Sequence, residues 1–161
     1  MAKVDEFKFV FFPETDHEVK VRARRIPGVN EELFDYWISC MPIPRTVWSP
    51  ALIAGHICYS HYLEMKVPMP YTIDELYNQG KFDLWYLDES KPGICTLFNG
   101  QGKNGEIICK WGPEVTEHMK YPVFAQVVDE DMDAFFAANQ KIWDMTYCGD
   151  KREMPVVEFE L

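Results

Sequence analysis

Alternation of apolar and polar residues with a period of two is the feature that most constrains the fold of this chain. Two successive segments, 6–14 and 17–26, carry it. Their apolar positions are Phe7, Phe9, Phe11, Val19, Val21 and Ala23. A period of two is typical of a strand with one buried face. The two segments are therefore predicted to form a β-hairpin with one solvent-exposed face.

Two later segments carry apolar residues at helical spacing. The first follows Asn30, which can cap a helix with an acidic first turn, and ends before Pro42. The second follows Asp129, predicted as its cap. The apolar residues of the two segments are Leu33, Phe34, Trp37, Ile38, Met41, Met132, Phe135, Phe136, Ile142 and Trp143. We predict two amphipathic helices that bury these side chains.

Short extended segments make up most of the remaining chain. They lie at 47–63, 83–87, 94–98, 106–111, 123–128 and 154–161. The chain has no β-α-β rhythm and no internal repeat. We therefore predict one domain over 1–161, mainly β with two helices, folded as a closed β-barrel with its helices outside or at the open ends.

A polar, proline-flanked stretch at 66–82 interrupts this pattern. Thr72 is a candidate N-cap and Gly80 a candidate stop for a short helix within it. We interpret the stretch as a surface insertion, which is either a lid over a site or an inert excursion.

A formal net charge of −10 limits the partners of the chain. An acidic surface repels phosphate backbones and anionic lipids, so nucleic-acid and membrane roles are disfavoured. No apolar run approaches the roughly 20 residues of a membrane-spanning helix. The five cysteines are widely spaced without a C-x-x-C pair, which argues against a disulfide framework and a structural zinc site. We expect a cytoplasmic protein with reduced thiols.

Several motifs resemble the small bacterial cyclophilin-like proteins. They are "CMPIP" at 40–44, "DLWYLDESKPG" at 83–93, "CKWGPE" at 109–114 and "YPVFAQV" at 121–127. The resemblance covers nearly the whole chain except 66–82 and implies a cyclophilin-like closed β-barrel. True cyclophilins are prolyl isomerases, but their F-H-R string is absent here, so the resemblance does not carry that activity over. A distant relative with this barrel, cucumopine synthase, performs a cofactor-free condensation, so the barrel can host chemistry.

The segment "LIAGHICYSHYLEM" at 52–65 places His56, His61 and Glu64 close together in sequence. In an extended chain, His56 and His61 point to opposite faces. In a helix they would lie about 140° apart. A local metal site is therefore disfavoured, and we predict no metal and no cofactor.

His61 shares one strand face with Tyr59, Ile57 and Leu63, and we expect this apolar face to point into the barrel. An inward histidine is either a satisfied core residue or, at the barrel mouth, a general acid or base with an ordinary pKa near 6.5. Tyr59 beside it would hold a substrate oxygen or orient a water. His61 and Tyr59 are the candidate catalytic residues.

The candidate ligand-binding residues come from several segments. They are Arg45, Trp48, His56, Glu64 and Trp111. Arg45 would either clamp a carboxylate or pair with a neighbouring glutamate. The two tryptophans would either wall a pocket or pack in the core. Glu64, like Glu106, would accept a proton only if it were buried in the mouth.

Two hypotheses of function follow. The first is a small-molecule binding protein or cofactor-independent enzyme that acts on a small polar or carboxylated metabolite in the barrel mouth. The second is a non-catalytic interaction module that binds a partner protein or its own copy, and prolyl isomerase is a distant third. Aromatic richness and an exposed barrel edge also make a homodimer reasonable.

Overall fold

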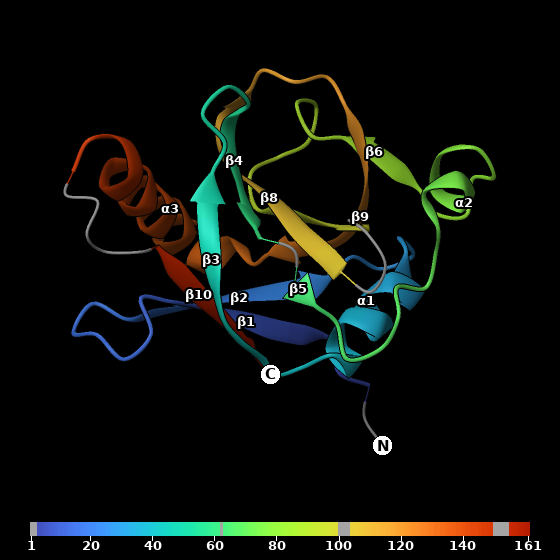
Figure 1. Cartoon of the computed structure of the whole chain (residues 1–161), viewed down its shortest axis with the longest axis horizontal. Coiled ribbons are helices and arrows are strands. Elements are labelled where there is room, and N and C mark those ends of the chain that lie inside the picture. The colour runs from blue at the N-terminus through green and yellow to red at the C-terminus, as the bar shows by residue number, and fades with distance from the viewer. Residues whose placement is uncertain (1–2, 62, 100–103, 150–154) are drawn as a thin grey trace.

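The computed structural model describes residues 3–61, 63–99, 104–149 and 155–161, and its strands form a closed barrel (Figure 1). The eight barrel strands are β1 (Glu6–Phe11), β2 (Val19–Arg25), β3 (Ile43–Pro50), β4 (Gly55–Ser60), β7 (Ile94–Asn99), β8 (Asn104–Val115), β9 (Lys120–Val127) and β10 (Val156–Glu160). Their order is β2-β1-β10-β3-β4-β8-β7-β9, and β9 pairs back with β2 to close the ring. All these pairings are antiparallel.

Two short strands extend this ring. β5 (Leu63–Glu64) pairs with β8, and β6 (Leu84–Tyr86) pairs with β9. The prediction of a mainly β chain folded as a closed barrel is confirmed.

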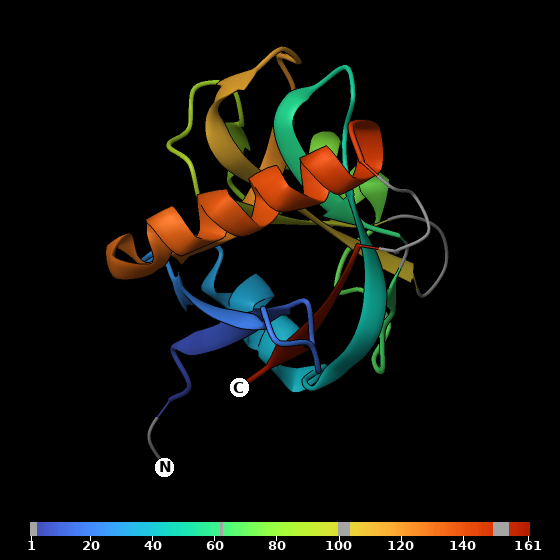
Figure 2. The same cartoon turned by 90° about the vertical axis from the view of Figure 1, so that its left-hand side faces the viewer.

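Helices cover the two ends of the barrel. α3 (Met132–Tyr147), which follows one turn of 3-10 helix at Asp129–Asp131, crosses one mouth (Figure 2). α1 (Glu31–Ser39) packs at the other end. The short α2 (Ile73–Tyr77) is a third helix, within the predicted insertion. None of the described helices is both long and apolar enough to cross a membrane.

Aromatic side chains fill the barrel, as the two-residue period predicts. Phe7, Phe9 and Phe11 are fully buried. The ring of Phe7 lies 5.6 Å from that of Trp37 on α1, and the ring of Phe9 lies 5.4 Å from that of Phe135 on α3. Burying each of these side chains contributes about 1.5–3 kcal/mol. One strand therefore anchors the helices at both ends of the barrel.

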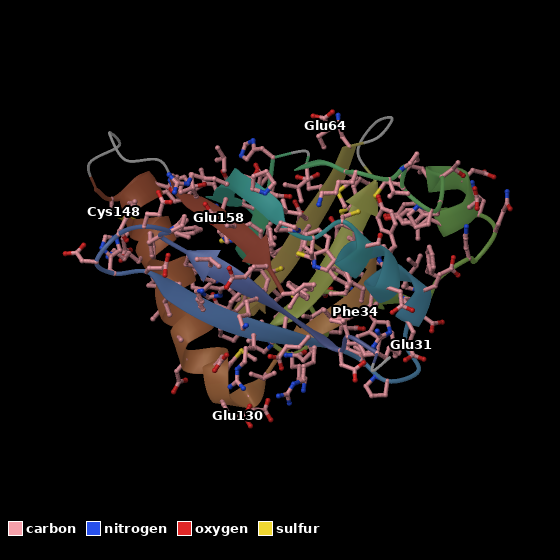
Figure 3. All side chains as sticks on the ribbon, turned by 90° about the horizontal axis from the view of Figure 1, so that it is seen from below. Glu31, Phe34, Glu64, Glu130, Cys148 and Glu158 are labelled. Atoms are coloured by element: carbon pink, nitrogen blue, oxygen red, sulfur yellow. The ribbon has the colours of Figure 1, made fainter. Side chains whose placement is uncertain are left out.

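Three neighbouring strands place cysteines side by side in the barrel interior. Cys58 on β4 is paired with Cys109 on β8, which is paired in turn with Cys95 on β7. All three are buried free thiols, and burial raises the pKa of Cys58 and of Cys109. Figure 3 shows sulfur atoms among the interior side chains. These thiols act as small core residues.

Asn30 is the N-cap residue of α1, as predicted, and its backbone carbonyl oxygen accepts from the N–H groups of Leu33 and Phe34, but its side chain makes no capping hydrogen bond. Its backbone has a positive φ of 45°, and its Nδ2 donates to the carbonyl oxygens of Asp83 and Val123 at 2.9 and 2.7 Å. The amide therefore joins the start of α1 to two other chain segments.

The prediction that Asp129 caps the last helix is wrong, because Asp129 is the first residue of the 3-10 turn that precedes α3. α3 begins at Met132, and the preceding Asp131 makes no side-chain cap. Its carboxylate instead accepts hydrogen bonds from Arg22 at 2.9 and 3.0 Å. Phe136, expected in the core, is 39% exposed.

The segment at 47–63 is a hairpin and not one continuous strand. β3 and β4 are joined by residues 51–54, and Gly55 has a φ of +79°, which favours glycine.

Within the predicted insertion, the cap at Thr72 is confirmed, because its Oγ1 accepts from the backbone N–H of Glu75 at 3.1 Å. Leu76 of α2 is fully buried.

Candidate functional site

The two faces of β4 are assigned correctly by residue parity, but their directions are reversed. Cys58 and Ser60 are fully buried inside the barrel. Tyr59 therefore lies on the outer face, and His61, just beyond the strand, is exposed. The prediction that His61 points inward is wrong. The outer face looks apolar in sequence because Ile57 packs there in a second buried cluster outside the barrel.

A cavity of about 170 Å³ opens on this outer face, and we call it the outer-face cavity. It is lined by Ala51, Ile53, Ala54, Ile57, Tyr59, Glu106, Ile108, Glu117 and Tyr121. Strand pairing places Tyr59 directly beside Ile108 of β8. The cavity therefore combines an apolar floor with carboxylate and phenol groups.

Glu106 is the most unusual group in the outer-face cavity. It is only 9% exposed. Burial raises the pKa of its carboxyl group. Among the described residues, no ion pair or hydrogen bond holds this carboxylate. A carboxylate whose pKa is raised by burial in a cleft is a candidate proton acceptor or donor.

Two tyrosines flank Glu106 in the cavity lining. Burial, with a smaller contribution from Glu117, raises the pKa of Tyr121 to about 12, so its hydroxyl stays protonated at neutral pH. Tyr59 stacks on the ring of His61 with centroids 5.3 Å apart. Nε2 of His61 is 2.7 Å from Oγ of Ser49. His61 therefore does not line the cavity itself but contacts Tyr59, which does.

A second cavity, of about 280 Å³, lies where β4 and β8 meet α3, and we call it the mouth cavity. It is lined by Gly55, His56, Trp111, Glu114, Gln140 and Trp143. The rings of His56 and Trp111 meet edge to face at 4.5 Å. The structure thus brings together two of the predicted ligand-binding residues.

The other three predicted ligand-binding residues line neither cavity. Arg45 pairs with Glu14 at 3.1 Å and with Glu158 at 3.4 Å. Of its two predicted roles, this is pairing with a neighbouring glutamate. Trp48 is fully buried in the barrel core. Glu64 is exposed on β5, where Figure 3 shows it projecting away from the barrel.

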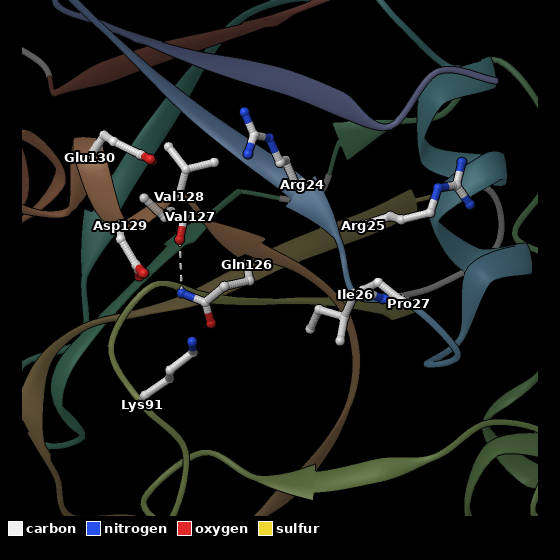
Figure 4. A pocket seen from close by; sticks show the side chains of 10 residues that line it. All are labelled: Arg24, Arg25, Ile26, Pro27, Lys91, Gln126, Val127, Val128, Asp129 and Glu130. Atoms are coloured by element: carbon white, nitrogen blue, oxygen red, sulfur yellow. Dashed lines mark hydrogen bonds between the residues drawn. The ribbon is translucent and has the colours of Figure 1, made fainter. Parts of the chain in front are cut away.

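A third cavity, of about 350 Å³, lies near the end of β2 (Figure 4). Its arginines do not converge, since Figure 4 shows Arg24 and Arg25 pointing in different directions. Arg24 pairs with Glu6 at 2.8 Å, and Arg25 pairs with Asp35 at 2.6 Å. Both guanidinium groups therefore form ion pairs within the chain near the ends of β1 and β2.

Sequence reasoning missed Tyr121, Glu117, Gln140 and Trp143 as lining residues. Glu117 lies between β8 and β9, and Tyr121 lies in β9. Both are far from β4 in sequence, so the closing of the barrel is what brings them near Tyr59. Glu106 has a visible signal, a charged residue at the start of the apolar run 106–111. Among the described residues, no group of three or more histidine, cysteine or acidic side chains is placed to hold a metal ion.

No family model matches the chain, and no curated protein matches it. Among solved structures, the chain is similar to the structure of McbB in complex with tryptophan, with a TM-score of 0.70 and 19% sequence identity. The match covers 96% of this chain and 44% of that one, so this chain spans less than half the length of its neighbour. At this identity the likeness shows a shared barrel fold.

Proposed function

We propose that the chain binds a small amine with an apolar body in the outer-face cavity, and that Glu106 accepts a proton from it. The observation that carries this proposal is the burial of the Glu106 carboxylate in a cavity, with no cation or hydrogen-bond donor on it among the described residues. A carboxylate on the wall of a largely apolar cavity is poorly solvated, and a cationic ligand supplies an opposite charge.

The charges of the lining select an amine over a carboxylate. Glu106 and Glu117 both line the outer-face cavity, and no lysine or arginine stands among its described lining residues. Such a cavity attracts cations and repels anions. Arg45, the anchor expected for a carboxylated metabolite, pairs with glutamates elsewhere. An ammonium group on an apolar body suits this charge pattern.

The raised pKa of Glu106 makes its carboxylate a stronger proton acceptor than an ordinary glutamate. In the proposed step, an N–H bond of the ligand ammonium breaks, its proton moves to the Glu106 carboxylate, and the nitrogen keeps the lone pair. The product is a neutral amine, which is a nucleophile. The hydroxyls of Tyr59 and Tyr121 would position the ligand, and the step uses only groups of the chain and the ligand.

The tryptophan in complex with the structural neighbour McbB supports this ligand class, since tryptophan carries an amine on an aromatic body. Several wider assignments are part of the same proposal. They are a cyclophilin-like single domain over 1–161, a surface insertion at 66–82, a cytoplasmic location and a homodimer. The resemblance of the sequence motifs supports the first of these.

Binding of three probes tests the proposal. Tryptamine carries only the amine, tryptophan both charges, and indole-3-propionate only the carboxylate. Calorimetry on the full chain is expected to show binding of tryptamine, weaker binding of tryptophan and none of indole-3-propionate. Glu106→Gln is expected to raise the Kd for tryptamine by about tenfold or more, because the ion pair is lost.

Glu64→Gln is the matched control, because Glu64 is an exposed carboxylate outside the cavity. Its Kd should stay within about twofold of the wild type. Equal binding by wild type and Glu106→Gln would contradict the proposal. Absence of binding, combined with self-association that Ile53→Ser abolishes, would favour the interaction module, since Ile53 is 80% exposed at the cavity rim.

A further inference from the structure

The mouth cavity is not used by the proposed function. It is separated from the outer-face cavity by the wall of the barrel, because His56 and Tyr59 point to opposite faces of β4. The two cavities share no lining residue. A ligand in one therefore contacts none of the side chains that hold a ligand in the other.

Two glycines allow the close packing of β4 and β8 around His56. A Cβ atom at residue 112 would lie 2.5 Å from Cγ of His56, so the ring fits only because residue 112 is glycine. A Cβ atom at Gly55 would lie 2.5 Å from the carbonyl oxygen of Glu114. β4 and β8 therefore approach each other closely here, with the imidazole held between them.

Hydrogen bonding fixes the tautomer of His56. Its Nδ1 accepts from the backbone N–H of Glu114 at 3.0 Å. In a neutral imidazole one nitrogen accepts and the other carries the proton, so Nε2 carries it here. The ring also meets Trp111 edge to face at 4.5 Å. His56 thus presents one oriented N–H donor.

The α3 side of the cavity supplies an acceptor and an aromatic wall. Gln140 donates from Nε2 to Oδ1 of Asp144 at 3.1 Å, which orients its amide and leaves Oε1 as an acceptor. Trp143, half-buried, is braced by the ring of Tyr147 with centroids 4.7 Å apart. The donor on β4 and the acceptor on α3 line the same cavity.

We infer that the mouth cavity binds a planar, uncharged nitrogen heterocycle. A ring nitrogen or carbonyl oxygen of the ligand accepts from Nε2 of His56, an N–H group donates to Oε1 of Gln140, and the ring lies against Trp143. Glu114 at the rim disfavours anions, and the oriented N–H of His56 disfavours cations. A volume of about 280 Å³ is near the lower end for small-molecule sites, so one or two fused rings fit.

Adenine is the probe, and amide and indole N–H signals in two-dimensional NMR of the full chain are the readout. We expect a saturable shift of the Trp143 indole signal, assigned with Trp143→Phe. His56→Phe keeps an aromatic ring and removes both nitrogens, so the Kd for adenine should rise by about tenfold. Gln140→Ala should raise it by about fivefold. Benzoate, a planar anion, should not bind.

Glu106→Gln is the control that separates this site from the proposed function, and it should leave the Kd for adenine unchanged. If His56→Phe does not fold, the Kd of Gln140→Ala for adenine tests the inference instead. Gln140 is a half-exposed helix residue, so this variant should fold. Absence of a saturable shift up to the solubility of adenine would overturn the inference. So would unchanged binding by the folded variants, or equal binding of benzoate.

Discussion

Nε1 of Trp48 donates a hydrogen bond to Oδ1 of Asn139 at 2.8 Å, and both side chains are fully buried. Trp48 lies on β3 inside the barrel, and Asn139 lies on α3 across its mouth. Nδ2 of Asn139 donates in turn to the carbonyl oxygen of Phe135 at 2.8 Å. The amide therefore ties the wall of the barrel to the helix that covers it, in an otherwise apolar contact.

Asn139→Ala is expected to lower the free energy of unfolding by about 1–3 kcal/mol, because it removes the amide oxygen that accepts from the buried indole N–H of Trp48. Urea denaturation followed by tryptophan fluorescence measures this difference. Gln140→Ala, at the next position of α3, is the control and should change the free energy by less than about 0.5 kcal/mol. Equal effects of the two substitutions would show that the hydrogen bond does not stabilise the helix contact.

Asp131→Asn is expected to lower the stability in a pH-dependent way. The hydrogen bonds from Arg22 hold the pKa of Asp131 below its ordinary value of 3.8. A lowered folded-state pKa contributes stability above the ordinary value, and this contribution is lost as the pH falls through the folded-state pKa. At pH 7 the loss should be about 1 kcal/mol, since the pair is partly exposed.

Thermal unfolding from pH 7 to pH 2.5 measures this difference, which should shrink as the pH falls below the ordinary value. Asp133→Asn is the control, because Asp133 is an exposed neighbour on α3. A difference from the wild type that stayed constant across this range would mean that Asp131 acts through something other than its charge.

Local patterns predicted the barrel because the inner face of its first strand, β1, is uniformly aromatic. Phe7, Phe9 and Phe11 are too large and apolar to face water on alternate positions, so their burial follows from the period of two. The cap at Thr72 was also predictable, because it depends only on Thr72 and Glu75, three residues apart.

The direction of β4 was not predictable in this way. Its inner face carries the small residues Cys58 and Ser60, while its outer face carries the larger Ile57 and Tyr59. Small residues suit an interior already filled by aromatic rings. Burial of the outer face depends on chain segments remote in sequence. The outer-face cavity could not be predicted either, because the wrong face of β4 was expected to be inside the barrel and because the burial of Glu106 depends on the same remote segments.

His61→Ala is expected to change the Kd for tryptamine by less than about twofold, because His61 is exposed and does not line the outer-face cavity. Tyr59→Ala, which removes a lining ring, should raise the Kd by about fivefold or more. Calorimetry on both variants makes the comparison. Loss of binding in His61→Ala alone, with the fold intact, would restore the proton-transfer role predicted for His61.

Glu106→Gln is expected to raise the stability of the ligand-free chain at neutral pH. Burial raises the folded-state pKa of Glu106 above its ordinary value of 4.5. The folded chain therefore binds more protons than the unfolded chain between the two pKa values, so its stability falls as the pH rises through that window. A neutral glutamine removes this penalty, and each unit of pKa difference corresponds to about 1.4 kcal/mol.

The Tm of Glu106→Gln should exceed that of the wild type at pH 7.5, and the gap should close at and below pH 4, where the carboxyl is protonated in both states. Scanning calorimetry across this range measures it, with Glu64→Gln as the exposed control that should show no such trend. A variant less stable than the wild type at pH 7.5 would mean that the Glu106 carboxylate is well solvated or paired in the free chain. The buried proton acceptor on which the proposed function depends would then be lost.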